Sequence, residues 1–488
     1  MRYAMNYKLI GRIIASLLVL EALFMVPAWG ISILHHETNG AFAFLKSQLI
    51  ILIAAAVLWV ITRNYSHNFY AKEGLVTTGF AWIALSLLGA LPFYISREIP
   101  SYIDALFEMV SGFTTTGSSI LARVEDLDFG ILYWRSFSHW VGGMGVLVFL
   151  LAVVPLSGKN EGFTLHILRA ESPGPSVGKL VPRMRQTAMI LYLIYVGLTV
   201  LDMLFLLLGG MSVFDAVCTA FGTAGTGGFG VHSDSLAGYS PYLQNVTTVF
   251  MLLFGINFSC YYLLLLRRFK EVFFDEELRL YVIIVLSSIA IIAWNIRGLY
   301  GSLEEVLRHA GFQVATVIST TGYATTDFDL WPSLSKAILL FLMLSGACAG
   351  STGGGMKVAR LLLLMKSLRR NFHANLHPSE VRKVRMNGSA VDEKVINNVN
   401  GYLIAYAAIV VVSFLVISID GFSMETNFSA VMATFNNIGP GFNAVGPTCN
   451  FSAYSPLSKL VMIIDMLAGR LEILPILVLF SRSTWMKN

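Results

Sequence analysis

Four short segments of the chain combine hydroxyl or amide side chains with glycine in a similar order. Each offers backbone and side-chain oxygens and none contains a charged residue. The segments are Thr114-Thr115-Thr116-Gly117-Ser118, Ala224-Gly225-Thr226-Gly227-Gly228, Ser319-Thr320-Thr321-Gly322-Tyr323 and Asn436-Asn437-Ile438-Gly439-Pro440. Because they are spread along most of the chain, they indicate an internal structural repeat and not a local low-complexity tract.

Neutral segments of this kind are suited to bind a monovalent cation. A ring of backbone carbonyl oxygens can replace the hydration shell of such an ion without the tight binding that a carboxylate imposes. Glycine takes positive φ angles at little steric cost, so it lets consecutive carbonyls turn toward one axis. We assign this role to Gly117, Gly227, Gly322 and Gly439. The predicted ion ligands are Thr115, Thr116, Gly117, Thr226, Gly227, Thr321, Gly322, Ile438 and Gly439.

The elements that must position these segments are membrane helices. Hydrophobic residues make up 56% of the 488 residues and charged residues 13%, with a mean hydropathy of +0.68, so lipid must be the solvent. A helix needs about 20 apolar residues to cross the hydrocarbon core of a bilayer. Candidate spans cover residues 13–34, 42–62, 75–96, 132–155, 188–208, 242–266, 279–296, 333–364, 402–419 and 457–480.

Each oxygen-rich segment lies at the end of a stretch too short to cross the membrane, and each stretch lies between two longer apolar runs. These stretches are Ala105–Ser119, Phe214–Gly230, Val306–Thr325 and Phe428–Gly441. We therefore expect an all-α integral membrane protein with four helix, half-helix, loop, helix repeats in a pseudo-fourfold arrangement, plus two extra N-terminal helices. The expected units are residues 1–70 outside the repeat, then repeats at 71–160, 161–272, 273–375 and 376–488.

A single Thr-Thr-Thr-Gly sequence is more often an ordinary turn after a helix. Four copies at membrane depth favour a shared pore, because non-helical backbone there must be buried in protein or line water. The basic residues gather in alternate loops, which the positive-inside rule places in the cytoplasm together with both termini. This pattern explains the net charge of +5 better than nucleic-acid binding does.

A second glycine-rich stretch interrupts the span predicted at 333–364. It contains Gly346, Gly350, Ser351, Thr352, Gly353, Gly354 and Gly355, and Lys357 follows it. Each glycine costs up to about 1 kcal/mol relative to alanine inside a helix, so we expect the helix to break here. The alternative is that the small residues only permit close helix packing.

Ionisable residues interrupt the last apolar span. Asp465, Arg470 and Glu472 lie where charged groups usually face a bundle interior or a water-filled cavity. Arg470 is the main candidate for a role in the ion path, and we expect Pro475 to kink the helix nearby. The alternative is that Arg470 only pairs with Asp465 or a carbonyl, and Glu472 is a further candidate partner.

Other chemistries find little support in the sequence. The histidines, among them His139, His232 and His309, show no metal-ligand spacing and are interpreted as loop or interfacial residues. The glycine-rich runs do not end in Gly-Lys-Ser/Thr, so no nucleotide site and no cofactor are expected on this chain.

The oxygen-rich segments resemble the filter loops of the TrkH/TrkG/KtrB potassium-uptake superfamily. The likeness is carried by Ser111-Gly112-Phe113-Thr114-Thr115-Thr116-Gly117, Ser319-Thr320-Thr321-Gly322-Tyr323 and Asn436-Asn437-Ile438-Gly439-Pro440-Gly441, and it extends over essentially the whole chain. The extra N-terminal helices are similar to the TrkH/TrkG branch. In plant relatives that transport sodium a serine replaces the first filter glycine, so Gly117 implies potassium as the substrate.

The resemblance also implies roles for the other two features and for partners. Residues 346–355 would be an intramembrane gating loop beneath the filter, with Lys357 at its end, and Arg470 would lie in the permeation path. A homodimer in the cytoplasmic (inner) membrane, seated on a TrkA-type nucleotide-binding regulatory subunit, is implied as well.

Two other classes of protein remain open from the residues alone. A secondary transporter of sodium or an organic solute also uses broken helices, but such folds usually contain two large repeats. A membrane-embedded enzyme would need clustered His, Asp or Glu at membrane depth, and we therefore predict no enzymatic activity.

Overall fold

The computed structural model describes residues 5–66, 69–145, 184–380 and 382–486, and in these ranges the chain is almost entirely helical. The one sheet in the described ranges is a short antiparallel hairpin, β1 (Arg385–Met386) with β2 (Ser389–Ala390). The all-α membrane fold is confirmed. The boundary predicted at 160/161 and the end of the span predicted at 132–155 lie outside the described residues, as do the basic residues Lys159, Arg169 and Lys179.

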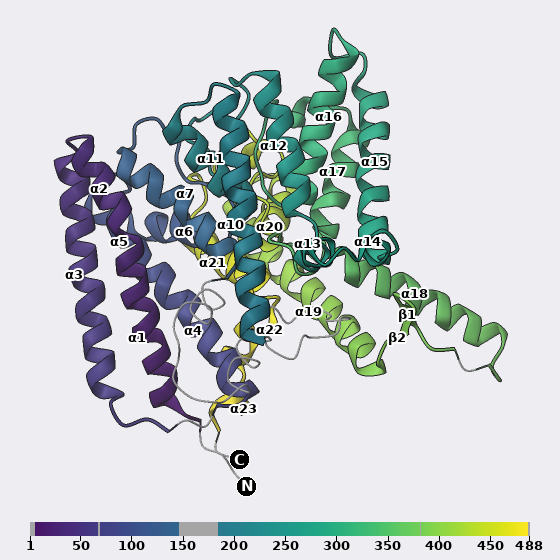
Figure 1. Ribbon diagram of the computed structural model, residues 1–488, viewed down its shortest axis with the longest axis horizontal. Coiled ribbons are helices and arrows are strands. Elements are labelled where there is room, and N and C mark those ends of the chain that lie inside the picture. The colour runs from purple at the N-terminus through teal and green to yellow at the C-terminus, as the bar shows by residue number, and fades with distance from the viewer. Residues whose placement is uncertain (1–4, 67–68, 146–183, 381, 487–488) are drawn as a thin grey trace.

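The helices follow the expected order of four repeats behind an N-terminal pair (Figure 1). The N-terminal pair is α1 (Tyr7–Phe24) with α2 (Val26–Leu34), and α3 (Thr38–Ile61). The first half of the repeat region contains α4 (Ala71–Gly89), α5 (Leu91–Ile95), α6 (Tyr102–Phe113), α7 (Phe129–Gly143), α10 (Met184–Leu208), α11 (Val213–Gly225), α12 (Pro241–Phe254), α13 (Phe258–Leu265) and α14 (Phe269–Phe273). The second half contains α15 (Glu276–Ile296), α16 (Leu303–Ile318), α17 (Ser333–Ser345), α18 (Val358–Leu376), α19 (Glu393–Ile417), α20 (Met424–Phe435), α21 (Pro456–Arg470), α22 (Leu474–Phe480) and α23 (Arg482–Trp485). Short 3-10 turns η1 (Phe328–Leu330), η2 (Ser418–Asp420) and η3 (Asn443–Val445) complete the list.

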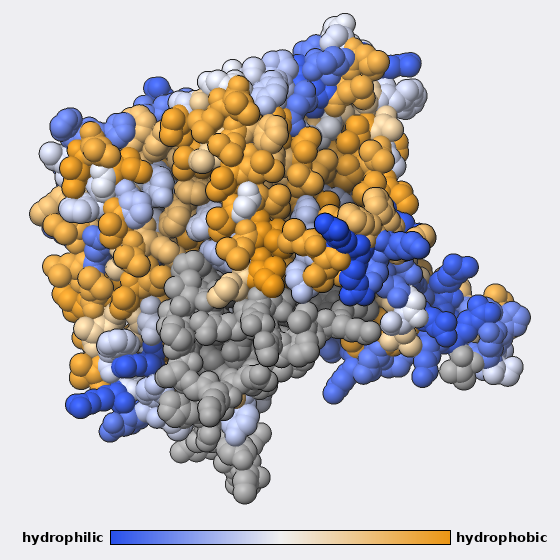
Figure 2. Space-filling model, in the orientation of Figure 1, coloured by the Kyte–Doolittle hydropathy of each residue, from blue (hydrophilic) through white to orange (hydrophobic). Residues whose placement is uncertain are grey.

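Six described helical segments are long and apolar enough to cross a membrane unbroken. They are Tyr7–Leu34, Thr38–Ile61, Ala71–Ile95, Ala188–Leu208, Glu276–Ile296 and Glu393–Asp420. Figure 2 shows apolar side chains over the middle of the visible face and hydrophilic ones along its upper edge and on the projecting α18 region. This distribution suits a lipid-facing belt between two aqueous sides.

Four short helices, α6, α11, α16 and α20, are the predicted half-helices, and most of their side chains are buried. Each begins at a serine N-cap whose side chain accepts the N–H three residues later, which satisfies one of the free donors at a helix start. The caps are Ser101, Ser212, Ser302 and Ser423. The helices therefore start one to four residues before the predicted stretches.

The span expected at 242–266 is not continuous. Its two parts, α12 and α13, are bent by 88° at a short break. The break exposes backbone groups that the glycine-rich segment of repeat 3 binds: Gly255 accepts the Cys348 N–H, and the Phe258 N–H donates to Gly350, both over 3.0 Å. Gly255 ends α12 and the Asn257 side chain caps α13, and the tertiary contacts with Cys348 and Gly350 bind the backbone groups left at the break.

The other two breaks follow the sequence more closely. α17 ends at Gly346 and α18 begins after Lys357, so the predicted interruption of the eighth span is confirmed. The last span breaks at Glu472 and Ile473, which have φ angles of 53° and 69°. The next helix begins at Leu474 with Pro475 in its first turn, where the N–H that proline lacks would have no helical partner.

Candidate functional site

Each half-helix ends in the same two hydrogen bonds. In repeat 1 the Thr116 N–H donates to the Ser111 carbonyl over 2.8 Å, and the Thr115 N–H donates to the Gly112 carbonyl over 3.1 Å. This pair of bonds is a Schellman ending, which places a left-handed residue just after the helix cap. The left-handed residues are Thr115, Thr226, Thr320 and Asn437, with φ angles of 55°, 55°, 60° and 55°. The same two bonds recur in the other repeats, donated by Gly227 and Thr226, by Thr321 and Thr320, and by Ile438 and Asn437.

The left-handed conformation is unfavourable for residues with a Cβ, at about 1–3 kcal/mol each, and persists where the surroundings over-determine it. The Thr320 hydroxyl accepts the Gly354 N–H over 2.6 Å. Within the described part of the chain, the Thr115 hydroxyl and the Asn437 amide oxygen are buried and have no hydrogen-bond partner. These two oxygens are therefore available to another ligand.

One glycine per loop has a positive φ angle, two residues after the left-handed residue. These glycines are Gly117 (82°), Gly228 (78°), Gly322 (88°) and Gly439 (104°). The assignment of this conformation to Gly227 is therefore wrong by one residue, because the Schellman ending fixes the register from Thr226. Gly227 must be glycine for another reason: a Cβ there would overlap the His139 ring.

The four loops close into a ring. A Cβ built on the positive-φ glycine of one repeat would collide with a carbonyl oxygen of the next repeat: Gly117 with Gly227, Gly228 with Thr321, and Gly322 with Ile438. Gly439 completes the circle, since its Cβ would lie 3.0 Å from the Thr116 carbonyl oxygen. In each case the carbonyl belongs to the residue before the next positive-φ glycine. The carbonyls of Thr116, Gly227, Thr321 and Ile438 thus occupy equivalent places around one axis.

Side chains tie neighbouring loops together. The Asn437 amide donates to the Thr116 hydroxyl over 2.9 Å, and the Ser118 hydroxyl donates to the Gly439 carbonyl over 2.9 Å. The hydroxyls of Thr116 and Thr321 also bond to Thr114 and Ser319 of their own loops, each over 2.7 Å. These hydroxyl bonds stabilise the loops, and the assignment of Thr116 and Thr321 as ion ligands stays a prediction.

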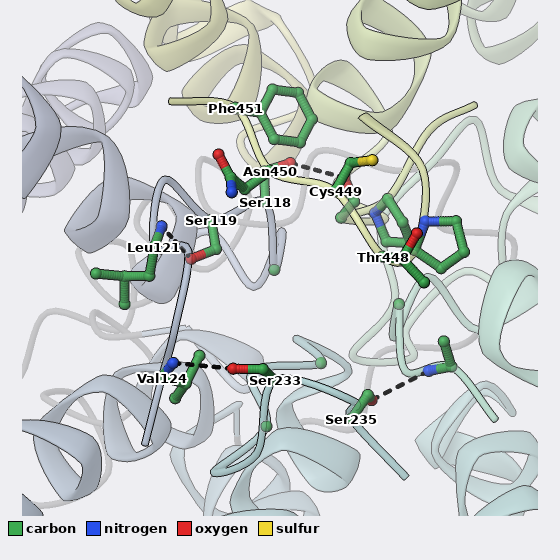
Figure 3. A pocket seen from close by; sticks show the side chains of 18 of the residues that line it. Ser118, Ser119, Leu121, Val124, Ser233, Ser235, Thr448, Cys449, Asn450 and Phe451 are labelled. Carbon is green, nitrogen blue, oxygen red and sulfur yellow. Dashed lines mark hydrogen bonds between the residues drawn. The ribbon is translucent and has the colours of Figure 1, made fainter. Parts of the chain in front are cut away.

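A polar cavity lies on one side of the ring and contacts all four positive-φ glycines. Figure 3 shows Ser118 and Ser119 of repeat 1, Ser233 and Ser235 of repeat 2, and Thr448 to Phe451 of repeat 4 around it. Among the described residues, those that line this cavity include no Asp or Glu. Any selection of cations here must therefore come from neutral oxygens and not from a carboxylate ring.

Two loops at the cavity are clamped by Glu125. Its carboxylate accepts the Ser233 N–H over 2.6 Å and the Ser233 hydroxyl over 2.5 Å. Burial raises the pKa of Glu125, but these hydrogen bonds outweigh it and lower the pKa to about 2. The clamp between repeats 1 and 2 is therefore ionised at physiological pH.

The glycine-rich segment of repeat 3 lies directly against the oxygen-rich loops of repeats 3 and 4. The Gly354 N–H bonds to the Thr320 hydroxyl, and a Cβ on Gly354 would lie 2.5 Å from the Asn436 carbonyl oxygen. A Cβ on Gly353 would lie 2.7 Å from the Ser319 carbonyl oxygen. Glu277 of α15 joins the first half of the segment to the start of α18 by accepting the N–H groups of Ala349 (2.6 Å) and Ala359 (3.1 Å).

Arg470 joins this segment to repeat 1. Its guanidinium donates to the Thr352 carbonyl over 2.7 Å and to the carbonyls of Gly142 and Gly143 at the end of α7, each over 2.6 Å. Lys357 donates back to the Gly353 carbonyl. Glu472 is not the partner of Arg470 in the structure, because it pairs with Arg360, and Asp465 accepts from Ser413.

Sequence reasoning missed two residues beside the filter. His139 is fully buried against Gly227, so its interpretation as a loop or interfacial residue is wrong. Arg135, one turn earlier on α7, is also buried. The available signal was an arginine and a histidine four residues apart in an otherwise apolar and aromatic segment, where ionisable residues usually mark a function.

Comparisons with known proteins agree with this geometry. The family model described as TrkH, a cation transport protein, matches residues 40–486. The potassium uptake protein TrkH of Salmonella typhimurium is 35% identical over 99% of this chain and 100% of its own, and TrkG of Escherichia coli is 33% identical over 98% and 99%. The crystal structure of the potassium transporter TrkH from Vibrio parahaemolyticus superposes with a TM-score of 0.89 at 32% identity, covering 99% of this chain and 100% of that one. The chain therefore belongs to the TrkH family of cation transport proteins.

Proposed function

We propose that this chain takes up potassium through a pore whose selectivity filter is the ring of four loops. The observation that carries the proposal is the closed ring, in which each positive-φ glycine faces a carbonyl of the next repeat. Carbonyls of Thr116, Gly227, Thr321 and Ile438 would form one layer of ion ligands, because peptide oxygens can replace the water around a potassium ion. The names of the relatives as potassium uptake proteins agree with this substrate.

The half-helices support cation binding electrostatically. All four end at the ring, so the partly negative carboxyl ends of their dipoles face the same place. The cavity beside the ring would be the outer vestibule. The buried, unpartnered oxygens of Thr115 and Asn437 lie at the left-handed positions and would add ligands at the inner end.

The segment Gly346–Gly355 would be the gate, and Arg470 and Lys357 would hold it closed by donating hydrogen bonds to its carbonyls. The segment lies across the inner end of the filter and bonds to Thr320, while the Arg470 guanidinium holds it to α7. Opening would require these bonds to break and the glycines to change conformation, which glycine does at low steric cost. A positive charge at this place also raises a barrier to cations.

The remaining proposals concern the setting of the pore. The Tyr7 and Trp485 rings stack at 6.4 Å, so the first and last described helices meet at one end of the bundle. We place that end and the basic α18 region in the cytoplasm, in the inner membrane, by the positive-inside rule. The four units at 71–160, 161–272, 273–375 and 376–488, a homodimer and a TrkA-type regulatory partner complete the proposal.

Flux into liposomes tests the pore. Purified protein should carry rubidium passively and saturably, and Gly228→Ala should reduce the initial rate by at least about tenfold, because its Cβ would displace the Thr321 carbonyl. Gly197→Ala is the matched control, since a Cβ there meets nothing within 4 Å. Flux of an organic solute or sodium that ignores Gly228 would contradict the proposal and favour a secondary transporter.

A further inference from the structure

The filter loop of repeat 2 contains few side chains that could hold it in place. Of residues 225–230, Gly225, Gly227, Gly228 and Gly230 are glycine, and the Thr226 hydroxyl bonds only to the neighbouring Gly225 carbonyl. The other loops have their own anchors: Ser118 in repeat 1, Tyr323 in repeat 3 and Asn437 in repeat 4. Glycine has the largest backbone freedom to lose, so loop 2 needs support from outside.

That support comes from one face of α7. Arg135 and His139 are four residues apart, so they lie one above the other on the same side of the helix. Their exposed fractions are 3% and 0%. α7 packs between α6 of repeat 1 and α11 of repeat 2 (Figure 1). Both side chains therefore sit at the boundary between the first two repeats.

Arg135 makes the first of two links between α6 and loop 2, and we call these two links together the brace. Its Nε donates to the Glu108 carboxylate of α6 over 2.6 Å, and a terminal nitrogen donates to the Gly230 carbonyl over 3.0 Å. The guanidinium also lies over the Phe229 ring, 3.5 Å from its centre. Glu108 in turn accepts the Ile120 N–H over 3.0 Å, so the carboxylate is held in place from both sides.

His139 makes the second link between α6 and loop 2. Its Nδ1 bonds to the Gly112 carbonyl of α6 over 2.8 Å, and its Nε2 accepts the Phe229 N–H over 3.2 Å. A carbonyl can only accept and an N–H can only donate, so these partners fix the neutral tautomer with the proton on Nδ1. The ring lies flush against Gly227, whose carbonyl is the repeat-2 member of the proposed ligand layer.

Both links connect the pore helix α6 with loop 2. Glu108 and Gly112 lie one turn apart on α6, and Phe229 and Gly230 directly follow the positive-φ glycine of loop 2. Because filter selectivity depends on where carbonyls sit, these contacts act on the ligand layer through loop 2. Arg135 also lines the cavity beside the ring, so its test keeps its charge.

We propose that Arg135 and His139 are positioning residues that set the potassium-over-sodium selectivity of the filter by fixing the repeat-2 carbonyls to pore helix α6. The inference rests on the proposed conduction function. It assigns to loop 2, the loop with the least anchoring of its own, a dependence on its neighbour repeat. Loss of either link should therefore change the potassium-over-sodium selectivity more than it changes the total flux.

The test compares rubidium with sodium flux in liposomes for His139→Phe. Phenylalanine keeps the ring volume but leaves the Phe229 N–H and the Gly112 carbonyl without their partner. The rubidium-to-sodium ratio should fall by at least about fivefold, the factor that corresponds to one of the two net hydrogen bonds lost. The control is His373→Phe, which removes a 2.8 Å bond to Glu380 beyond the ring, on α18, and should keep the ratio.

Arg135→Lys provides a second measurement if His139→Phe does not fold. Lysine keeps the charge but cannot reach Glu108 and Gly230 together with a planar fork, so the ratio should fall here too. A folded variant of either kind with the wild-type ratio would overturn the brace while leaving conduction intact. Absence of rubidium flux in the wild-type protein would overturn the proposed function and the brace with it.

Discussion

Thr115, Thr226 and Thr320 adopt a left-handed backbone conformation that β-branched residues rarely take. The sequence could predict that a glycine in each loop would have positive φ, because that preference belongs to the residue itself. It could not predict that threonine would, since the Schellman bonds and the packing of the loop impose this conformation. The same cause explains the error at Gly227, where two adjacent glycines left the register open until Thr226 fixed it.

Arg470→Ala should raise the basal rubidium flux. The substitution removes a positive charge from the proposed ion path and also frees the Thr352 carbonyl that the guanidinium holds. A unit charge about 4 Å from an ion in a wet pore is worth about 1 kcal/mol, so the rate should rise about fivefold or more. Initial rates in liposomes measure this.

Arg268→Ala is the control for this substitution, because Arg268 is an exposed residue paired with Glu271. It should leave the rate unchanged. An unchanged or abolished flux in folded Arg470→Ala would assign Arg470 a structural role only, as a cap for the carbonyls that end α7.

At the scale of elements, local patterns predicted which segments are helical better than they predicted where helices stop. The half-helices, the unbroken spans and the interruption at Gly346 all follow from apolar length and glycine content. The 88° bend between α12 and α13 does not, because its freed backbone groups bond to Cys348 and Gly350 of another repeat. Each half-helix begins earlier than predicted because apolar periodicity does not reveal the serine N-cap.

Glu277→Gln should loosen the glycine-rich segment. One carboxylate oxygen of Glu277 accepts the N–H groups of both Ala349 and Ala359, so it ties the first half of the segment to the start of α18. A neutral amide accepts more weakly than a carboxylate. We expect faster amide hydrogen exchange in this segment and a rise of about two- to fivefold in basal rubidium flux.

The neighbouring residue supplies the control for Glu277→Gln. Glu276 pairs with Lys366 and, among the described residues, makes no hydrogen bond to the glycine-rich segment. Glu276→Gln should therefore change neither the hydrogen exchange nor the flux. If exchange accelerates in Glu277→Gln while flux stays constant, the segment is loosened but does not gate the pore.

At the scale of the whole molecule, the property that matters is closure of the ring. The sequence predicts four similar loops and a shared axis, yet it does not state which carbonyl each glycine would face. That order depends on helices such as α7 and α12, which set the distance between consecutive repeats. The contacts of His139 and Arg135 with loop 2 arise in the same way, since residues 90 or more positions apart meet only after assembly.

The vestibule offers a thiol with which to test the direction of the pore. Cys449 lines the cavity that contacts the four positive-φ glycines (Figure 3) and is exposed. Cys218, Cys260 and Cys348 are buried. A membrane-impermeant, positively charged methanethiosulfonate reagent added outside intact cells should therefore modify Cys449 and lower rubidium uptake severalfold. The reason is that a fixed positive charge would lie in the proposed vestibule, whose described lining residues include no carboxylate to offset it. The negatively charged reagent of similar size should inhibit less, since only its bulk opposes the ion. Cys449→Ser should abolish both effects. Inhibition that requires access from the cytoplasm would invert the proposed orientation of the filter.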